Sequence, residues 1–517
     1  MNNFVSAVKK QAEDALPNVS VTENGAIGFK TTGKKLLDLN FKLSSLRNMS
    51  NIEIWQNFML AYAENPVLAV IWLFFARDVR GGCGERRVFR EIFARLSYEN
   101  PDLMAKLVHL IPFYGRWDDV IELYFSDIPC VVRDAVFDLI SKQIQSDILC
   151  ANTNQPVSLL GKWMPSLSTS SRESRNRAEA LRTALQWTPK QYRKNLTGLR
   201  KQIKVVEQQM SANQWGSIDY EAVPSRAAMN YRDAFSRHDG SRYSEYLESV
   251  RNGDAKINSG VLFPYDIVHA YRNSNLNRTL EEQWKALPNT VPSNQSTLVI
   301  VDGSGSMFST VGRTSVSCHD VARSLAIYFA EKIHGPLHNT FITFSANPRI
   351  ISFPDNLSLC AKLNIIKQYD ECSNTNIEKT FDLLLNTAVK HRFAQEDIPA
   401  NLLIVSDMEF DIAVDRAGCD WEWADNVHGP VDQTLFDSIR ERWEEAGYKL
   451  PRLVFWNVCS RTGTIPLQNN DLGVALVSGF SPNIADMVMS AELDPYKCLI
   501  DKLNSDRYEP VRKALKG

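Results

Sequence analysis

The chain has 517 residues, of which 44% are hydrophobic and 23% charged, and its formal net charge is −2. This length exceeds the ~100–200 residues of a typical domain, so we expect more than one domain. No apolar run approaches the ~20 residues of a membrane helix, Met1 is not followed by a signal-peptide core, and the nine cysteines include no Cys-x-x-Cys pair. We therefore expect a cytoplasmic protein with reduced thiols and without a zinc site or disulfide framework.

The first part of the chain, from residue 37 to residue 124, has a helical pattern. Apolar residues recur three and four positions apart in segments that short turns connect. The expected helices are residues 54–62, 67–75, 88–96, 103–110 and 117–124. Short helices in series predict an all-α helical-repeat domain whose helices bury their apolar faces by stacking. We find no strict sequence period, so the repeats would be degenerate.

Two turns in this helical region, residues 77–87 and 110–119, combine arginines with aromatic residues and glycines. Glycine and aspartate caps of ordinary interhelical turns explain such residues in one interpretation. In the other, the turns contact RNA, because guanidinium groups suit phosphate and aromatic rings suit bases. The candidate RNA contacts in these turns are Arg77, Arg80, Arg86 and Arg116.

The stretch 172–204 is strongly basic. It holds ten lysines and arginines against two acids, with Trp187 and Tyr192 between them. A one-signed run with aromatic residues is more typical of a nucleic-acid surface, although a solvated helix face is the alternative. The candidate RNA-binding residues of this stretch are Arg172, Arg175, Lys190, Tyr192, Arg193, Arg200, Lys201 and Lys204.

Residues 287–294 are rich in turn-forming residues and mark a domain boundary. Beyond them strands and helices alternate, which predicts a mainly parallel, doubly wound, Rossmann-like sheet. The expected strands are residues 298–301, 339–345, 402–405, 452–457 and 473–477. We therefore predict two domains, an all-α helical-repeat domain over residues 1–288 and an α/β domain over residues 289–517.

The first strand of the α/β domain ends in a group of oxygen-bearing side chains. Residues 297–301 form an uncharged, β-branched run, typical of a strand that is buried on both faces. Asp302, Ser304 and Ser306 follow it. Open α/β sheets bind ligands at the carboxyl ends of their strands. One carboxylate and two hydroxyls in this place predict a hard divalent cation such as Mg²⁺.

This Asp-x-Ser-x-Ser string resembles the metal-ion-dependent adhesion site of von Willebrand factor A domains. The resemblance implies a Thr from a later loop and an Asp after a further strand, which here are Thr375 and Asp407. It implies an Mg²⁺ ion, or another divalent cation, with one position open to an acidic residue of a protein partner. The implied metal ligands are Asp302, Ser304, Ser306, Thr375 and Asp407. Ordinary turn and helix-cap chemistry is the alternative explanation.

Two further carboxylates, Glu409 and Asp411, follow Asp407 in place of the glycine that is commoner in that family. We expect them to add metal ligands, to repel an acidic group of a partner, or to be ordinary helix-cap and solvent carboxylates. Residues 401–450 hold twelve acids and four bases in all, which predicts a negative rim on this domain.

The order of motifs along the chain resembles the TROVE module of the Ro autoantigen and telomerase-associated RNA-binding proteins, joined, as in Ro, to a C-terminal von Willebrand A domain. The strings that carry this resemblance are RDVRGGCGER, IPFYGRWDD, GKWMPS, QYRKNLTGLR, VVEQQMSANQW, SGVLFPYDIVHAY, IVDGSGSM, IVSDMEFD and RLVFWNV. The resemblance implies a closed ring of HEAT-like repeats. Such a ring binds single-stranded RNA ends in its hole and structured RNA on its basic outer face.

Three hypotheses follow. The first is a monomeric RNA-binding protein with a metal-dependent partner domain and no catalytic activity. The second is a metal-dependent phosphoesterase or nuclease that uses Asp302 and Asp407, although no His or Lys is placed beside them in the sequence as a general acid or base. The third is a protein-binding scaffold on which the basic stretch is incidental.

Overall fold

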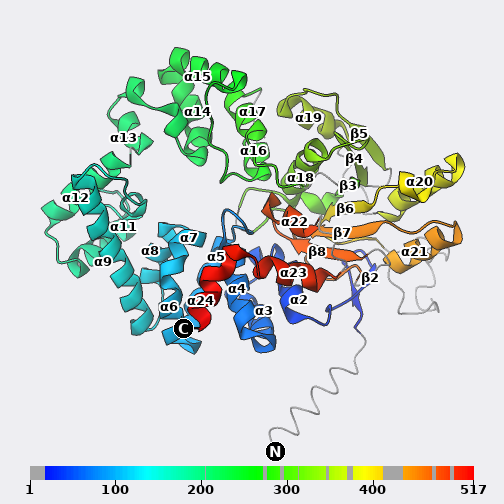
Figure 1. Ribbon diagram of the computed structural model, residues 1–517, viewed down its shortest axis with the longest axis horizontal. Helices are drawn as coiled ribbons and strands as arrows, with labels where there is room; N and C mark the ends of the chain where they lie inside the picture. The colour runs from blue at the N-terminus through cyan, green and yellow to red at the C-terminus, as the bar shows by residue number, and fades with distance from the viewer. Residues whose placement is uncertain are drawn as a thin grey trace, which may run out of the picture. The chain divides into compact units, whose positions relative to one another are not determined.

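The computed structural model in Figure 1 describes residues 18–203, 205–271, 276–291, 296–312, 314–344, 348–369, 376–411, 435–467, 473–488 and 494–516. The chain forms two compact units. The α/β unit comprises Met1–Met49 and Asn289–Lys502, and the helical unit comprises Ser50–Pro288 and Leu503–Gly517. The boundary near residue 288 agrees with the expected one. The expected domains differ at the two ends of the chain, because residues 1–49 belong to the α/β unit and residues 503–517 belong to the helical unit.

The α/β unit is built on a six-stranded sheet of mainly parallel strands. The strands, in their order across the sheet, are β5 (Arg349–Ser352), β4 (Thr340–Phe344), β3 (Thr297–Asp302), β6 (Asn401–Ser406), β7 (Arg452–Asn457) and β8 (Val474–Ser478). Only β5 pairs antiparallel, at the edge beside β4. The expected parallel sheet is confirmed. The sequence did not predict β5, because this short edge strand buries only Ile351 and has little hydrophobic pattern.

Helices connect these strands along the chain: α18 (Cys318–Lys332), α19 (Leu359–Ile366), α20 (Glu378–His391) and α21 (Leu435–Glu445). Two more, α22 (Ala485–Val488) and α23 (Pro495–Leu503), follow β8. Helix α18 begins with a capping box, in which Ser317 and Asp320 satisfy each other's backbone N–H groups. This helix packs against β3, β4 and β6. It therefore begins beside the loop that follows Asp302 and covers the strands that carry the candidate metal ligands.

The N-terminal segment belongs to the α/β unit because specific hydrogen bonds attach it there. It forms β1 (Ser20–Val21), β2 (Ile27–Gly28) and α2 (Lys35–Phe41). The Thr22 hydroxyl donates to the Phe410 carbonyl at 2.7 Å, and the Asn457 side-chain amide donates to the Phe41 carbonyl at 2.9 Å. These partners lie more than 380 residues apart in the sequence. Local patterns therefore carry no signal for this docking.

The helical unit consists of consecutive helices that pack on their neighbours: α3 on α4, α4 on α5 and α5 on α6. Its helices are α3 (Asn51–Glu64), α4 (Pro66–Arg77), α5 (Arg86–Glu99), α6 (Pro101–Leu107), α7 (Ile111–Tyr114), α8 (Trp117–Phe125), α9 (Cys130–Asn152), α10 (Leu160–Trp163), α11 (Arg172–Ala184), α12 (Pro189–Gln202), α13 (Val206–Ser211), α14 (Ser225–His238), α15 (Gly240–Asn252), α16 (Pro264–Ala270), α17 (Arg278–Lys285) and α24 (Glu509–Lys516). The five expected helices between residues 54 and 124 are confirmed. A repeat architecture and a closed ring stay predictions.

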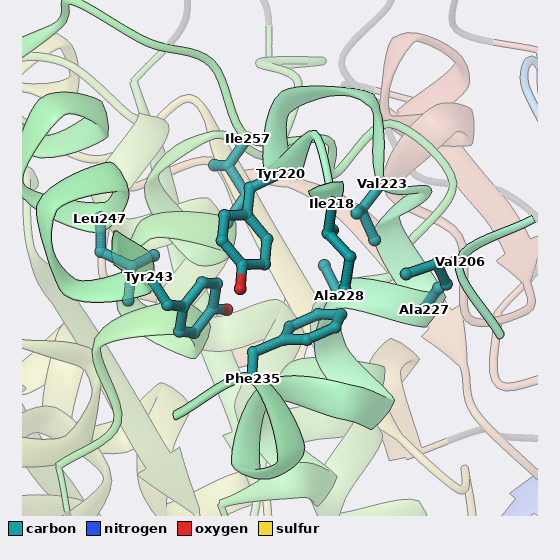
Figure 2. Packing of buried hydrophobic residues seen from close by; sticks show 10 residues of the cluster. All are labelled: Val206, Ile218, Tyr220, Val223, Ala227, Ala228, Phe235, Tyr243, Leu247 and Ile257. Carbon is teal, nitrogen blue, oxygen red and sulfur yellow. The ribbon is translucent and has the colours of Figure 1, made fainter. Parts of the chain in front are cut away.

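An aromatic core holds α13, α14 and α15 together (Figure 2). The rings of Tyr220, Phe235 and Tyr243 meet with centroid distances of 4.7–5.3 Å. The Tyr220 hydroxyl donates to Asp239 at 2.8 Å, and the Tyr243 hydroxyl bonds Thr279 at 2.8 Å. The buried tyrosines thus keep their polar ends satisfied while their rings fill the core.

The C-terminal segment packs on the first helices of the helical unit. Arg507 forms an ion pair with Asp78, which is buried, and the Tyr508 hydroxyl donates to the same carboxylate at 3.1 Å. The Tyr114 ring stacks on Tyr508 with a centroid distance of 5.6 Å. Helix α24 packs on α4 and α6. The glycine-rich turn after α4 therefore binds the end of the same chain through Asp78.

Two predictions about the chain concern membrane helices and disulfides. Among the helices that the structure describes, none has both the length and the apolar character that crossing a bilayer requires. The seven cysteines in the described part of the chain are all free thiols. Cys372 and Cys419 lie outside the described residues.

Candidate metal centre and candidate nucleic-acid surface

The candidate metal centre lies where β3 and β6 end. These strands are parallel neighbours, with Val301 paired to Val405, so Asp302 and Ser406 follow side by side. Both residues are fully buried. The Ser406 hydroxyl donates to Oδ2 of Asp302 at 2.5 Å, and the Ser304 N–H donates to Oδ1 at 2.9 Å. The Asp302 carboxylate therefore has a fixed orientation.

The two predicted serines join this carboxylate. Ser304 lies just before a short 3₁₀ helix, Gly305–Phe308, and Ser306 lies in it, and their hydroxyl oxygens are 2.9 Å from each other. The Ser306 hydroxyl also lies close enough to the carboxylate of Asp407, the residue directly after β6, to lower the pKa of that carboxyl. Asp302, Ser304, Ser306 and Asp407 therefore come together, as the Asp-x-Ser-x-Ser string and the resemblance to the metal-ion-dependent adhesion site imply. Thr375 lies outside the described residues.

The two carboxylates are kept in an unfavourable electrostatic environment. Burial, together with the nearby Asp407 charge, raises the pKa of Asp302 to about 7. Burial raises the pKa of Asp407 to about 6, although the Ser306 hydroxyl and the Arg461 guanidinium oppose this shift. A divalent cation would relieve the repulsion between the two carboxylates. Two carboxylates and two hydroxyls form an all-oxygen donor set, which fits Mg²⁺.

A metal-binding cluster of three or more His, Cys, Asp or Glu side chains does not occur among the described residues. The donor set at the end of β3 has only two carboxylates, and its remaining oxygens come from serines. An internal cation lies beside it: the Arg461 Nη2 is 2.9 Å from Oε2 of Glu23 and 3.5 Å from Oδ2 of Asp407. Sequence reasoning missed Arg461 because it lies 54 residues after Asp407 and in no recognised motif.

Glu409 has a structural role and does not face the metal centre as a ligand. It is fully buried. Its Oε1 accepts from the backbone N–H groups of Arg461 and Thr462 at 2.8 and 2.9 Å and from the Ser460 hydroxyl at 3.1 Å. Its Oε2 accepts from the Glu23 N–H at 2.9 Å. This carboxylate therefore connects the loop after β7 to the N-terminal segment.

In the helical unit, α12 is built to present a basic face. Thr188 and Gln191 form a capping box at its start, and Pro189 occupies the first helical position. Its apolar face, Tyr192, Leu196 and Leu199, is buried against α9 and α10. The opposite face carries lysines and arginines.

The predicted RNA-binding residues of α11 and α12 fall into two groups. The exposed ones are Arg172, Arg175, Lys190, Arg193 and Lys201. Two predictions need correction: Tyr192 is fully buried and donates its hydroxyl to the Pro165 carbonyl, and Arg200 donates to the carbonyls of Gly161 and Met164 at 3.0 and 2.7 Å. These two side chains position α12. Lys204 lies outside the described residues, and Lys194 is a further exposed lysine on this helix.

The arginines of the two turns, residues 77–87 and 110–119, also differ in their exposure. Arg77 is buried, and its Nε and Nη2 both donate to Oδ2 of Asp119, at 2.9 and 2.6 Å, so its prediction as an RNA contact needs correction. Arg80 and Arg86 are exposed, and Arg116 is half-buried. Side chains of one residue type thus serve both as internal ion pairs and as surface charges.

Comparisons with known proteins agree with the two-part organisation and state no activity. Residues 296–509 match a family described as "Domain of unknown function (DUF7788)", and residues 130–298 match "Domain of unknown function (DUF2828)". The chain is also similar to the "Uncharacterized protein L728" of Acanthamoeba polyphaga mimivirus. The two are 28% identical over 537 residues, which cover 96% of this chain and 89% of the viral protein.

Proposed function

We propose that the chain is an RNA-binding protein of the Ro type, in which the helical unit binds RNA and the α/β unit holds a divalent cation for partner binding. No catalytic step is part of this proposal. The observation that carries it is the exposed basic face of α11 and α12. The two acids of this stretch, Glu173 and Glu179, are already paired with Arg177 and Arg182. They therefore do little to neutralise the remaining basic residues.

Phosphate charge dominates nucleic-acid affinity, so this face would bind RNA largely without regard to its sequence. The buried side of α12, held by Tyr192 and Arg200, would keep the lysines and arginines in fixed positions. The proposal for the α/β unit has separate support. Four of the five implied metal ligands converge, and they leave two buried carboxylates that a cation would stabilise.

The test for RNA binding is a filter-binding titration of the full chain at two salt concentrations. The variant replaces four exposed residues of α12, Lys190, Arg193, Lys194 and Lys201, by Gln; Arg200 is left in place because it anchors the helix. Affinity should fall for every RNA tested, and the salt dependence should become shallower by up to about 0.7–0.9 log units per lost phosphate contact. Helicity should persist, because Gln is a good helix former.

A matched control replaces four exposed basic residues elsewhere in the helical unit, Lys106, Lys142, Arg251 and Lys256, by Gln. It changes the net charge by the same amount and should change RNA affinity much less. An equal loss of RNA affinity in both variants would show that only the overall charge of the chain matters. Unchanged affinity in the α12 variant would refute the RNA-binding face.

A further inference from the structure

A pocket of about 750 Å³ opens beside α5 in the helical unit. This volume lies in the range of about 300–1,000 Å³ that is typical of small-molecule sites. Most of its wall comes from α5, and the rest comes from Asn51 and from residues 126–127 after α8. The charged and aromatic lining residues of α5 are Arg86, Arg87, Arg90, Glu91, Arg95 and Tyr98.

The pocket wall carries a positive charge. Four arginines and two acids, Glu91 and Asp127, line the pocket, and Arg95 is paired with Glu91 at 2.5 Å. Two aspartates outside the wall pair with Arg86 and Arg90, and one of them, Asp119, also pairs with the buried Arg77. Asp118 lies 3.5 Å from Arg86 and 3.0 Å from Arg90, and the buried Asp119 lies 2.7 Å from Arg90. Guanidinium groups held in this way are preorganised, which lowers the entropic cost of binding an anion.

Arg116, just before α8, adds to this positive region. It is half-buried, and its guanidinium makes no hydrogen bond or ion pair with any residue that the structure describes. Burial and the neighbouring Arg86 lower the pKa of Arg116; the Asp118 charge opposes this shift, and Arg77 and Arg226 add to it. Positive charges are thus gathered here in excess of their acidic partners, an arrangement that favours an anionic ligand.

An aromatic ring lies at the same pocket. The Tyr98 side chain is 54% exposed, although it is large and partly apolar. Its hydroxyl donates to Oδ1 of Asp127 at 2.7 Å, which fixes the direction of the ring. A fixed, exposed ring next to guanidinium groups offers a stacking surface and an anion site together.

We propose that this pocket binds a nucleotide, with its phosphate on the α5 arginines and its base against the Tyr98 ring. Arginine forks match the geometry of phosphate oxygens, and bases of any identity stack on aromatic side chains. The nucleotide is either a free molecule or one unit of an RNA strand. The second source rests on the proposed function, and the first does not.

The experiment titrates the full chain with AMP, adenosine and inorganic phosphate by calorimetry. AMP should bind more tightly than either fragment. Replacing Arg86 and Arg87 by Gln should weaken AMP binding at least about tenfold, because both rim arginines are exposed and lose their charge. Replacing Lys142 and Arg251 by Gln removes two charges elsewhere in the unit and should leave AMP binding unchanged.

The aromatic contact has its own variants. Tyr98→Ala should weaken AMP binding about fivefold or more and leave phosphate binding unchanged, because only the base loses its partner. Tyr98→Phe keeps the ring and should retain most of the affinity. Thermal melting checks that each variant is folded. Equal AMP affinity in Tyr98→Ala and wild type would refute the base contact.

A 5′-phosphorylated tetranucleotide distinguishes the two sources. If AMP fails to bind but the tetranucleotide binds and loses affinity in the Arg86/Arg87 variant, the pocket takes a unit of RNA. AMP binding that survives in the α12 variant supports the pocket even where the proposed RNA function fails. The pocket assignment is overturned when neither AMP nor the tetranucleotide is affected by the Arg86/Arg87 substitutions.

Discussion

The Ser406 hydroxyl reaches across two neighbouring strands and donates a 2.5 Å hydrogen bond to Oδ2 of Asp302. Both residues are fully buried. A buried carboxylate requires donors, and here β6 supplies one while the Ser304 N–H supplies the other. Ser406 therefore orients a carboxylate that would bind the cation, in the way that outer partners orient metal ligands.

Ser406→Ala should weaken Mn²⁺ binding, measured by calorimetry as a substitute for Mg²⁺, by about 10–100-fold. The reason is that Asp302 loses the donor that favours its charged form and fixes its direction. Ser324→Ala is the matched control, because this buried serine of α18 donates only to its own helix, to the Val321 carbonyl. Equal Mn²⁺ affinity in both variants would contradict the role of Ser406.

The stability of the metal-free α/β unit should depend on pH. Asp302 and Asp407 have pKa values of about 7 and about 6 in the folded chain, above the ordinary 3.8. Protonation therefore favours the folded state, and the free energy of unfolding should fall as pH rises from about 4 to about 7. Hydrogen exchange of β3 and β6 amides in a chelator measures this. Asp302→Asn should flatten the dependence, and saturating Mg²⁺ should restore stability at pH 7.5. A variant as pH-dependent as wild type would rule out Asp302 as the cause.

The helical unit should respond to pH in the opposite direction. Burial would raise the pKa of Asp119, but Arg77 and Arg90 outweigh this effect and lower it. The ion pairs therefore stabilise the unit at neutral pH and are lost as the pH falls below about 4, where the unfolded carboxyl titrates. Hydrogen exchange of α4, α5 and α8 amides between pH 3 and pH 6 follows this loss.

Asp119→Asn should destabilise the helical unit by about 3–5 kcal/mol, because it leaves Arg77 buried without its counter-charge. Denaturant unfolding measures the change. Asp118→Asn is the control and should cost clearly less, since its partners Arg86 and Arg90 are more exposed. If the two variants are equally stable, the buried pair contributes no more than the exposed one.

Glu409→Gln should loosen the N-terminal segment from the α/β unit. The substitution places an amide NH₂ against N–H donors from Glu23 or from Arg461 and Thr462, at a cost of about 1–3 kcal/mol. Limited proteolysis should then cut between residues 18 and 33 faster than in wild type. Glu378→Gln, at a buried glutamate of α20 that pairs with Arg442, serves as the comparison. Cleavage at the wild-type rate would show that Glu409 does not hold this segment.

Sequence patterns predicted the mainly parallel sheet and the grouping of Asp302, Ser304 and Ser306, and the resemblance to the metal-ion-dependent adhesion site added Asp407. The reason is geometric. Each carboxylate follows a buried, uncharged run, and parallel neighbours bring such positions to one edge of the sheet. The helices between residues 51 and 125 were predicted for a similar reason, because their three- and four-residue spacing is a local property.

Only the tertiary structure decided which charged residues are internal partners and which face solvent. Arg77, Asp78 and Arg80 lie within four positions of one turn, yet the first two are buried in ion pairs and the third is exposed. Their partners, Asp119 and Arg507, come from elsewhere along the chain. The same holds for Glu409 and Glu23. The partner of a buried charge is set by which residues the fold places next to it. These partners lie tens to hundreds of residues away in the sequence, so local sequence patterns do not identify them.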